Sequence, residues 1–433
     1  MKNLVFFASL LLITAVMYAQ SPYHNIKITD ENSPSEVTIS FNPLNPMNLV
    51  AAANIESYFY SFDGGLTWQT RKLESTFGVY GDPCIVADVR GNFYYFHLSN
   101  SYSEGGKWLD RIICQKSEDG GISWSNGTYM GANPPHLQDK EWGAVDQTFS
   151  PFRNNIYCAW TQCGQHKYSE EGTALNPLDS ASNIIFSYST DGGETWAERK
   201  RINELSGAEC SDAGATTLGV VPCVGLNGEV YLTWCSPYGL MLDRSTDGGI
   251  TFWEKDVKVA DLPGTFRFKV PGVYRTFGFP SMVCDMSNSS NRGTLYISWS
   301  DQKNGYENTD VWISSSTNEG ITWAPPVKVN DDTGAKHQFF NWMTIDQETG
   351  IIYIVFYDRR NYDDDMTDVY LASSSDGGKT FLNERISDSP FYPLAETFMG
   401  DYTNVIAVNG MVRPIWTRLD SNKLSIYTAI IDK

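Results

Sequence analysis

An eight-residue pattern, Ser-x-Asp-x-Gly-x-Thr-Trp, occurs six times in this chain and constrains the fold more than any other feature. The copies read SFDGGLTW, SEDGGISW, STDGGETW, STDGGITF, STNEGITW and SSDGGKTF. Their third positions are Asp63, Asp119, Asp191, Asp247, Asn318 and Asp376, which lie 56 to 72 residues apart. A pattern that returns at such intervals indicates a repeat architecture.

Each copy has the composition of a β-hairpin tip. Asp or Asn can hydrogen-bond the nearby backbone, Gly tolerates a positive φ, and the final aromatic ring can cover the turn. Between the copies lies a second repeat, a pair of short apolar strands such as VPCVGLNGEVYLTW. Seven such pairs with six hairpin tips predict seven four-stranded sheets, in which the octets are structural.

The last unit contains only three evident strands, at residues 402–409, 411–419 and 423–432. A fourth strand can come from residues 26–31, so that the two chain ends close a ring and leave no exposed sheet edge. We therefore expect an all-β fold, a β-propeller with seven four-stranded blades. A six-bladed ring is the alternative, and residues 20–433 form the single domain.

The first 19 residues have the features of a signal peptide. Lys2 precedes an apolar run over residues 4–17, and cleavage after Ala19 would release the mature chain. We expect a secreted or periplasmic protein without a membrane span.

An oxidising compartment permits disulfides. Among the eight cysteines, Cys163 and Cys210 lie in loop-like sequence, which makes them the expected pair.

The net charge limits the classes of molecule that this protein can bind. The 433 residues include 51 acidic and 32 basic side chains, a formal net charge of −19. This field disfavours nucleic acid and anionic membranes, but it allows a neutral partner or an anion held by a local basic cluster. We expect a monomer.

The octets resemble the Asp boxes, or bacterial neuraminidase repeats, of the sialidase superfamily, and the resemblance covers essentially the whole mature chain. It implies a propeller fold. It does not fix the activity, because Asp-box propellers include sialidases, other glycosidases, polysaccharide lyases and proteins with no known activity.

In a propeller, the segments that lead into the innermost strands meet the turns between second and third strands at one mouth of the central channel. The candidate residues on these segments are Asp82, His136, Glu141, Trp142, Arg275, His337, Trp342, Arg359, Glu396, Asp401, Tyr402 and Arg418. Aromatic faces stack on sugar rings and guanidinium groups bind carboxylates, so this mouth is a candidate carbohydrate site. The structural interpretation is that acids such as Asp82 or Asp401 only cap the starts of strands.

The resemblance to sialidases implies an exo-α-sialidase-like glycoside hydrolase that acts on an acidic sugar, which we favour over a lyase, and it implies particular roles for these residues. Arg275, Arg359 and Arg418 would clamp a substrate carboxylate, Tyr402 beside Glu396 would be the nucleophile, and Asp82 the acid. Glu141, Trp142, Trp342 and Asp401 would bind substrate. The chain departs from the family where sialidases carry an Arg in a Phe-Arg-Ile-Pro motif, because the corresponding stretch SPSEVTISF has Glu36 and no Arg.

Two alternatives stay open. A polysaccharide lyase acting on a uronate polymer could use His136 or His337 as the base and Arg275 or Arg359 to neutralise the carboxylate. A non-catalytic glycan- or protein-binding propeller could hold Ca²⁺ at Asp363, Asp364 and Asp365 or at Asp331 and Asp332. We expect no other cofactor.

Overall fold

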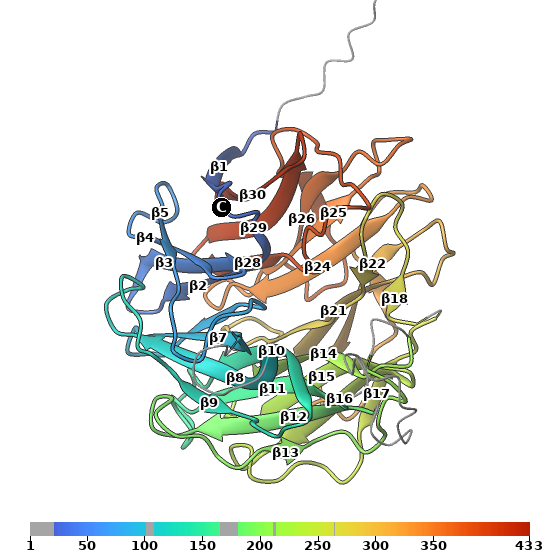
Figure 1. Ribbon diagram of the computed structural model, residues 1–433. Coiled ribbons are helices and arrows are strands. Elements are labelled where there is room, and N and C mark those ends of the chain that lie inside the picture. Colours follow the sequence, from blue (N-terminus) through green and yellow to red (C-terminus); the bar gives the residue numbers. More distant parts are fainter. Residues whose placement is uncertain (1–20, 101–107, 165–180, 211–213, 264) are drawn as a thin grey trace, which may run out of the picture.

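A computed structural model describes residues 21–100, 108–164, 181–210, 214–263 and 265–433. These residues form 30 β-strands and, within the described ranges, no helix. Seven four-stranded sheets radiate around a centre as the blades of a propeller (Figure 1). The prediction of a seven-bladed, all-β propeller is confirmed, and the six-bladed alternative is wrong.

Every blade is a meander of antiparallel strands. Blades 1 to 4 comprise β2–β5 (Ser35–Asn42, Asn45–Asn54, Ser57–Ser61, Gln69–Lys72), β6–β9 (Cys84–Ala87, Phe93–Asn100, Trp108–Ser117, Thr128–Met130), β10–β13 (Leu137–Val145, Ile156–Cys163, Ser182–Ser189, Lys200–Arg201) and β14–β17 (Leu218–Val224, Val230–Ser236, Gly239–Ser245, Val257–Ala260). Blades 5 to 7 comprise β20–β23 (Ser281–Cys284, Leu295–Asp301, Asp310–Ser316, Val327–Lys328), β24–β27 (Gln338–Ile345, Ile352–Asp358, Asp368–Ser374, Leu382–Arg385) and β28–β30 (Asn404–Val408, Met411–Asp420, Lys423–Asp432) with β1 (His24–Thr29). A small hairpin, β18 (Arg267–Phe268) and β19 (Thr276–Phe277), stands between blades 4 and 5.

The first strand of each blade lines the centre of the ring. These strands contact one another in the order β2, β6, β10, β14, β20, β24, β28 and back to β2. Large side chains on the second strands fill the space between blades, and Trp160, Trp234, Trp299 and Trp416 are completely buried. His97 occupies the matching place on β7, where its ring bonds Leu98 O and Gln115 Oε1 and burial lowers its pKa to about 4.

The chain ends close the ring as predicted. Strand β1 pairs antiparallel with β30, and the sheet order β1-β30-β29-β28 completes the seventh blade. Figure 1 shows this N-terminal strand beside the C-terminal one. The Tyr23 hydroxyl donates to Glu384 at 2.7 Å and accepts from Lys433 at 2.8 Å, which fastens both ends to the neighbouring blade.

The six octets form the tips between the third and fourth strands of blades 1 to 6, as predicted. In the first, Asp63 accepts hydrogen bonds from Ser61 Oγ at 2.7 Å, from the Thr67 amide at 2.9 Å and from Thr67 Oγ1 at 2.6 Å. The Trp68 indole donates to Gly65 O at 2.9 Å, which holds the ring under the turn. Both oxygens of the Asp63 carboxylate are therefore engaged in the hairpin itself.

The opposite ends of the blades carry a different irregularity. Strands β2, β10, β14 and β24 are bulged near their starts, and each bulge contains a residue of positive φ: Glu36, Lys140, Gly219 and Phe340. Asp82 and Gly400, with φ of 51° and 92°, lie just ahead of β6 and β28. Left-handed backbone at non-glycine residues is strained and is concentrated at functional sites in proteins. The strain is concentrated here at one mouth of the channel.

The expected signal peptide, residues 1–19, lies outside the described residues. In the described part of the chain no helix is long and apolar enough to span a membrane.

Cys163 and Cys210 form the predicted disulfide, with 5.3 Å between their Cα atoms. The other six cysteines are buried thiols.

Candidate functional site

A cavity of about 700 Å³ opens at the strained mouth of the channel. Its walls come from the starts of inner strands and from turns between second and third strands, which is where the sequence places functional groups. Four acidic side chains line it, Glu36, Asp82, Asp139 and Glu396, together with a single described basic side chain, Arg275. The cavity is therefore acidic as well as open to solvent.

The centre of the cavity is a pair of carboxyl groups, Glu36 and Asp82. Glu36 stands on the bulge of β2, and only 2% of its surface is exposed. Burial raises the pKa of Glu36 well above its usual range, and the charges of Asp82 and Asp401 and a hydrogen bond with Asp82 raise it further. The surroundings of Glu36 therefore favour its protonated form.

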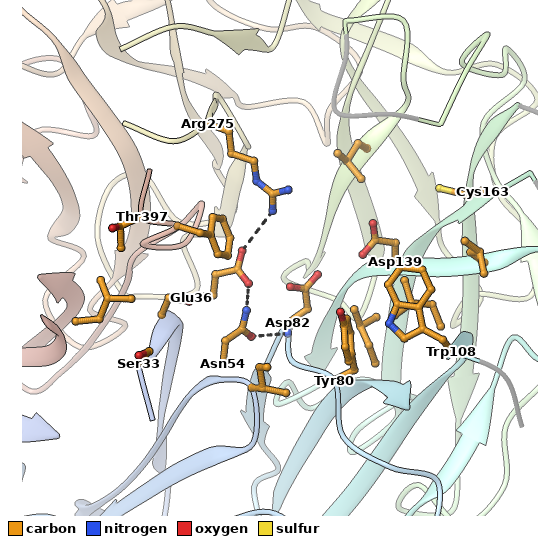
Figure 2. A pocket seen from close by; sticks show the side chains of 18 of the residues that line it. Ser33, Glu36, Asn54, Tyr80, Asp82, Trp108, Asp139, Cys163, Arg275 and Thr397 are labelled. Atoms are coloured by element: carbon orange, nitrogen blue, oxygen red, sulfur yellow. Dashed lines mark hydrogen bonds and ion pairs between the residues drawn. The ribbon is translucent and has the colours of Figure 1, made fainter. Parts of the chain in front are cut away.

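Asn54 fixes the pair in place from the end of β3. Its amide nitrogen donates to Glu36 Oε2, and its amide oxygen accepts the backbone N–H of Asp82 at 2.7 Å. Figure 2 shows Asn54 between the two acids. One side chain on blade 1 thus orients an acid of its own blade and the strand start of blade 2.

Arg275 reaches the cavity from the loop between β18 and β19, and Asp401 holds it there. Arg275 Nε lies 3.0 and 2.9 Å from the two oxygens of Asp401, and Nη2 lies 2.5 Å from Oδ2. Arg275 Nη2 is also 3.9 Å from Glu36 Oε1. Burial raises the pKa of Asp401, while the charge of Arg275 and its hydrogen bonds oppose that rise.

Two aromatic rings form one wall of the cavity beside Asp82. Tyr80 and Trp108 meet edge to face, with ring centres 5.4 Å apart, and both line the cavity. Figure 2 places them next to Asp82 and Asp139. Across the cavity Phe398 packs on Arg275, whose guanidinium carbon is 4.6 Å from the ring centre. Exposed aromatic faces beside carboxyl groups suit a sugar, which has apolar faces and polar edges.

A buried layer lies behind this cavity around the propeller axis. Trp142 and Trp342 pack with ring centres 4.4 Å apart, and Tyr402 meets Trp142 edge to face at 5.7 Å. Lys140 Nζ lies 3.8 Å from the centre of the Tyr402 ring. The hydroxyl of Tyr402 and both oxygens of Glu141 are buried without a hydrogen-bond partner among the described residues. Burial is the main cause that raises the pKa of both groups well above their usual ranges.

The structure divides the predicted site residues into three groups. Asp82, Arg275 and Glu396 line the cavity; Glu141, Trp142, Trp342, Asp401 and Tyr402 lie behind it; His136, His337, Arg359 and Arg418 do not line it. Glu396 is exposed, and the acids that act on the pKa of Tyr402 are Glu36, Asp82 and Glu141. The catalytic and binding roles assigned to these residues stay predictions.

The three arginines expected to converge on one carboxylate are held apart. Arg359 donates to Pro271 O at 2.7 Å, to Asp365 at 3.1 Å and to Thr367 Oγ1 at 3.0 Å. Arg418 binds Asp420 and, at 3.2 Å, Asp388. Both guanidinium groups are therefore bound by loop residues, although Arg359 Nη2 is buried without a hydrogen-bond partner among the described residues.

The two histidines proposed as bases are also engaged elsewhere. His337 Nδ1 is 2.9 Å from Thr309 Oγ1, and burial together with the charge of Arg359 lowers its pKa to about 4. His136 is bonded locally to Asn133.

The acidic clusters considered for calcium pair with basic side chains. Asp331 binds Arg360, Asp363 binds Lys336 and Asp365 binds Arg359. Within the described ranges, no group of three or more His, Cys, Asp or Glu side chains has the arrangement of a metal site.

Sequence reasoning missed two members of the cavity, Asn54 and Trp108, and assigned Glu36 no role. Glu36 was visible in SPSEVTISF as a lone charge at the start of a strand. Asn54 and Trp108 carry no local signal, because their contacts with Glu36, Asp82 and Tyr80 join residues that lie far apart in the sequence.

Comparison with known proteins agrees with the fold. The family model described as BNR/Asp-box repeat matches residues 59–70 and 187–198. No curated protein sequence matches the chain. The two matched stretches contain the first and third of the six tips, so the chain carries Asp-box repeats on a seven-bladed β-propeller, as the sequence predicts.

Solved structures with similar folds have diverse descriptions. A polysaccharide lyase described as an ulvan lyase superposes with a TM-score of 0.53 at 10% identity, covering 94% of this chain and 96% of its own. A leech intramolecular trans-sialidase gives 0.52 at 13% identity, covering 86% and 71%. A Dyadobacter fermentans protein of unknown function gives 0.51 at 12% identity, covering 95% and 98%. At these identities the likeness concerns the fold alone.

Proposed function

We propose that this protein is a glycoside hydrolase in which the Glu36–Asp82 pair supplies the proton to the leaving oxygen and Asp139 is the second carboxylate. The observation that carries the proposal is the pair of carboxyl groups, Glu36 and Asp82, that Asn54 holds on the wall of a cavity of about 700 Å³. Glycosidases require one protonated and one ionised carboxyl group on either side of the scissile bond.

The environments of these acids suit the two roles. Glu36 is buried in surroundings that favour its protonated form, and Asp82 lines the cavity beside it. Asp139, on β10, lines the same cavity from blade 3 (Figure 2). A substrate ring bound against Tyr80 and Trp108 would place its glycosidic oxygen beside Asp82.

The fold comparisons support a carbohydrate substrate. The similar folds include a trans-sialidase, an α-L-arabinofuranosidase from Fusarium graminearum and a polysaccharide lyase. A sialidase mechanism is supported less well, because Arg359 and Arg418 do not line the cavity and Glu36 stands where sialidases carry an arginine. A lyase would need a base other than His136 or His337.

We further propose that the chain is secreted or exported to the periplasm as a monomer, after cleavage near Ala19. The Cys163–Cys210 disulfide supports an oxidising compartment.

The test is a panel of chromogenic glycosides, sialosides included, together with uronate polymers. We expect release of a sugar from at least one glycoside, and Asp82→Asn should lower kcat by about 100-fold or more, since general acid catalysis contributes this much. Asp191→Asn, at an Asp-box tip, is the matched control and should retain activity. Unsaturated products from uronate polymers would replace the proposal by a lyase, and glycan binding without turnover would replace it by a lectin-like role.

A further inference from the structure

We propose that the cavity selects a sugar without a carboxylate, and that Asp401 enforces this selection by neutralising Arg275. This inference rests on the proposed carbohydrate site and names its substrate class. It follows from the charges and contacts around the one arginine of the described cavity wall.

Arg275 is placed where a substrate would meet it. Its side chain is 26% exposed and lines the cavity with Glu36 and Asp82. The guanidinium carbon of Arg275 lies 4.6 Å from the ring centre of Phe398 and 5.4 Å from that of Phe277. These rings and the loop between β18 and β19 hold the group in one orientation.

The charge of Arg275 is already matched from inside the protein. Asp401, only 3% exposed, engages Nε and Nη2 at once, in the fork-shaped geometry by which arginine binds carboxylates. Asp401 therefore occupies one of the two edges by which this guanidinium can bind a carboxylate in a fork. It comes from the start of blade 7, whereas Arg275 comes from the loop ahead of blade 5, so the pair forms through the closed ring rather than through a local contact.

The remaining charges of the described wall repel an anion. Asp82, Asp139 and Glu396 line the cavity with Glu36, and no basic side chain besides Arg275 appears in the described lining. Lys140, the next cation, has its ammonium over the Tyr402 ring in the layer behind the cavity. A carboxylated sugar would have to share the charge of Arg275 with Asp401 and enter a negative field, whereas an uncharged sugar avoids both costs.

The inference predicts a gain of function. Asp401→Asn removes the negative charge that matches Arg275 and leaves the arginine at the cavity surface. We expect this variant to bind galacturonate at least tenfold more tightly than the wild type does. The wild type should bind galactose more tightly than galacturonate, two sugars that differ only in the carboxylate.

Binding is measured by calorimetry or by ligand-observed NMR at millimolar sugar, so that the result does not depend on turnover. Asp420→Asn is the matched control, because it removes a carboxylate from Arg418 outside this cavity. It should leave both affinities unchanged. The double variant Asp401→Asn, Arg275→Gln should lose the gained galacturonate binding, and near-ultraviolet circular dichroism checks that each variant is folded.

The outcomes separate this inference from the proposed hydrolysis. A folded Asp401→Asn variant that gains no galacturonate binding overturns the inference, whether or not the protein cleaves glycosides. Wild-type protein that prefers galacturonate to galactose overturns it as well. Should Asp401→Asn itself unfold, Asp401→Ser takes its place with the same expected gain.

Discussion

At the rim of the propeller Asp63 and its counterparts accept hydrogen bonds from their own hairpins, whereas at the mouth Glu36 and Asp401 are buried among other acids. Burial raises the pKa of Asp63, but hydrogen bonds from Thr67 and Ser61 outweigh it, so the pKa is lowered. Burial also raises the pKa of Glu36, and there the charges of Asp82 and Asp401 add to it. The surroundings of the same chemical group thus favour its ionised form at the rim and its protonated form at the mouth.

The rim and the mouth differ in whether their arrangement of carboxylates is repeated from blade to blade. The rim arrangement is copied from blade to blade, because each copy needs only eight consecutive residues. The mouth arrangement occurs once, because Glu36, Asp82, Arg275 and Asp401 come from different blades or the loop between them. Repeated carboxylates therefore support the fold, and the unrepeated ones are the candidates for chemistry.

Among substitutions at the mouth and the rim, Gly400→Ala should change the free energy of unfolding most. Gly400 has φ of 92°, and a Cβ there would lie 2.6 Å from the backbone nitrogen of Glu36. Strain and overlap together should lower the free energy of unfolding by about 3 kcal/mol, measured by urea denaturation.

Gly305→Ala is the matched control for Gly400→Ala. Gly305 has φ of 127°, yet a Cβ there would meet nothing within 4 Å. It should cost only about 1 kcal/mol. Equal losses in the two variants would show that the contact between Gly400 and Glu36 is unimportant.

A smaller effect, of opposite sign, is expected from Glu36→Gln. The raised pKa means that the folded state binds the Glu36 proton more tightly than the unfolded state does, so ionisation removes stability as pH rises above the ordinary value of 4.5. The glutamine side chain cannot ionise, so the variant should be more stable than wild type by about 1–2 kcal/mol at pH 8 and equal to it at pH 4. Unfolding free energies at the two pH values decide this, and a variant that is less stable at pH 8 contradicts it.

The smallest effect concerns the rim. Although burial raises the pKa of Asp376, hydrogen bonds from Thr380, Ser374 and Lys379 bring it to about 2. A lowered pKa contributes stability above the ordinary value of 3.8 that is lost as pH falls toward 2. Asp376→Asn should therefore cost about 1 kcal/mol at pH 7, allowing for solvent screening of this exposed turn, and little at pH 2. A loss that is the same at both pH values would assign the effect to geometry rather than charge.

Local sequence was sufficient for the blades because each octet and each strand pair lies within one repeat, and the ring closure followed from counting the strands of the last blade. The octets predicted six tips, and the missing strand of the last blade predicted the pairing of β1 with β30. The position of the mouth followed from the same repeat, which is why Asp82, Arg275 and Glu396 were found in the cavity lining.

The partners of those residues could not be predicted in the same way. Arg359 and Arg418 lie at the ends of second strands and Arg275 precedes a first strand, so the repeat predicts all three at the mouth. Asp365 and Asp420, however, lie close enough along the chain to pair with Arg359 and Arg418. Asn54 joins two blades through a side chain whose local sequence indicates only a turn. Which nearby side chain a given residue pairs with depends on distances of a few ångströms, and a repeat pattern in the sequence does not determine them.

The contact of Gly400 with Glu36 joins the last blade to the first, and it has a consequence for biosynthesis. A chain emerging from the ribosome can complete its early blades, but Asp401 and Gly400 are made last, so the cavity wall stays incomplete until then. The cavity can therefore form only after the last blade has packed against the first. Truncated chains, however well their remaining blades pack, would leave the ribosome without a finished pocket.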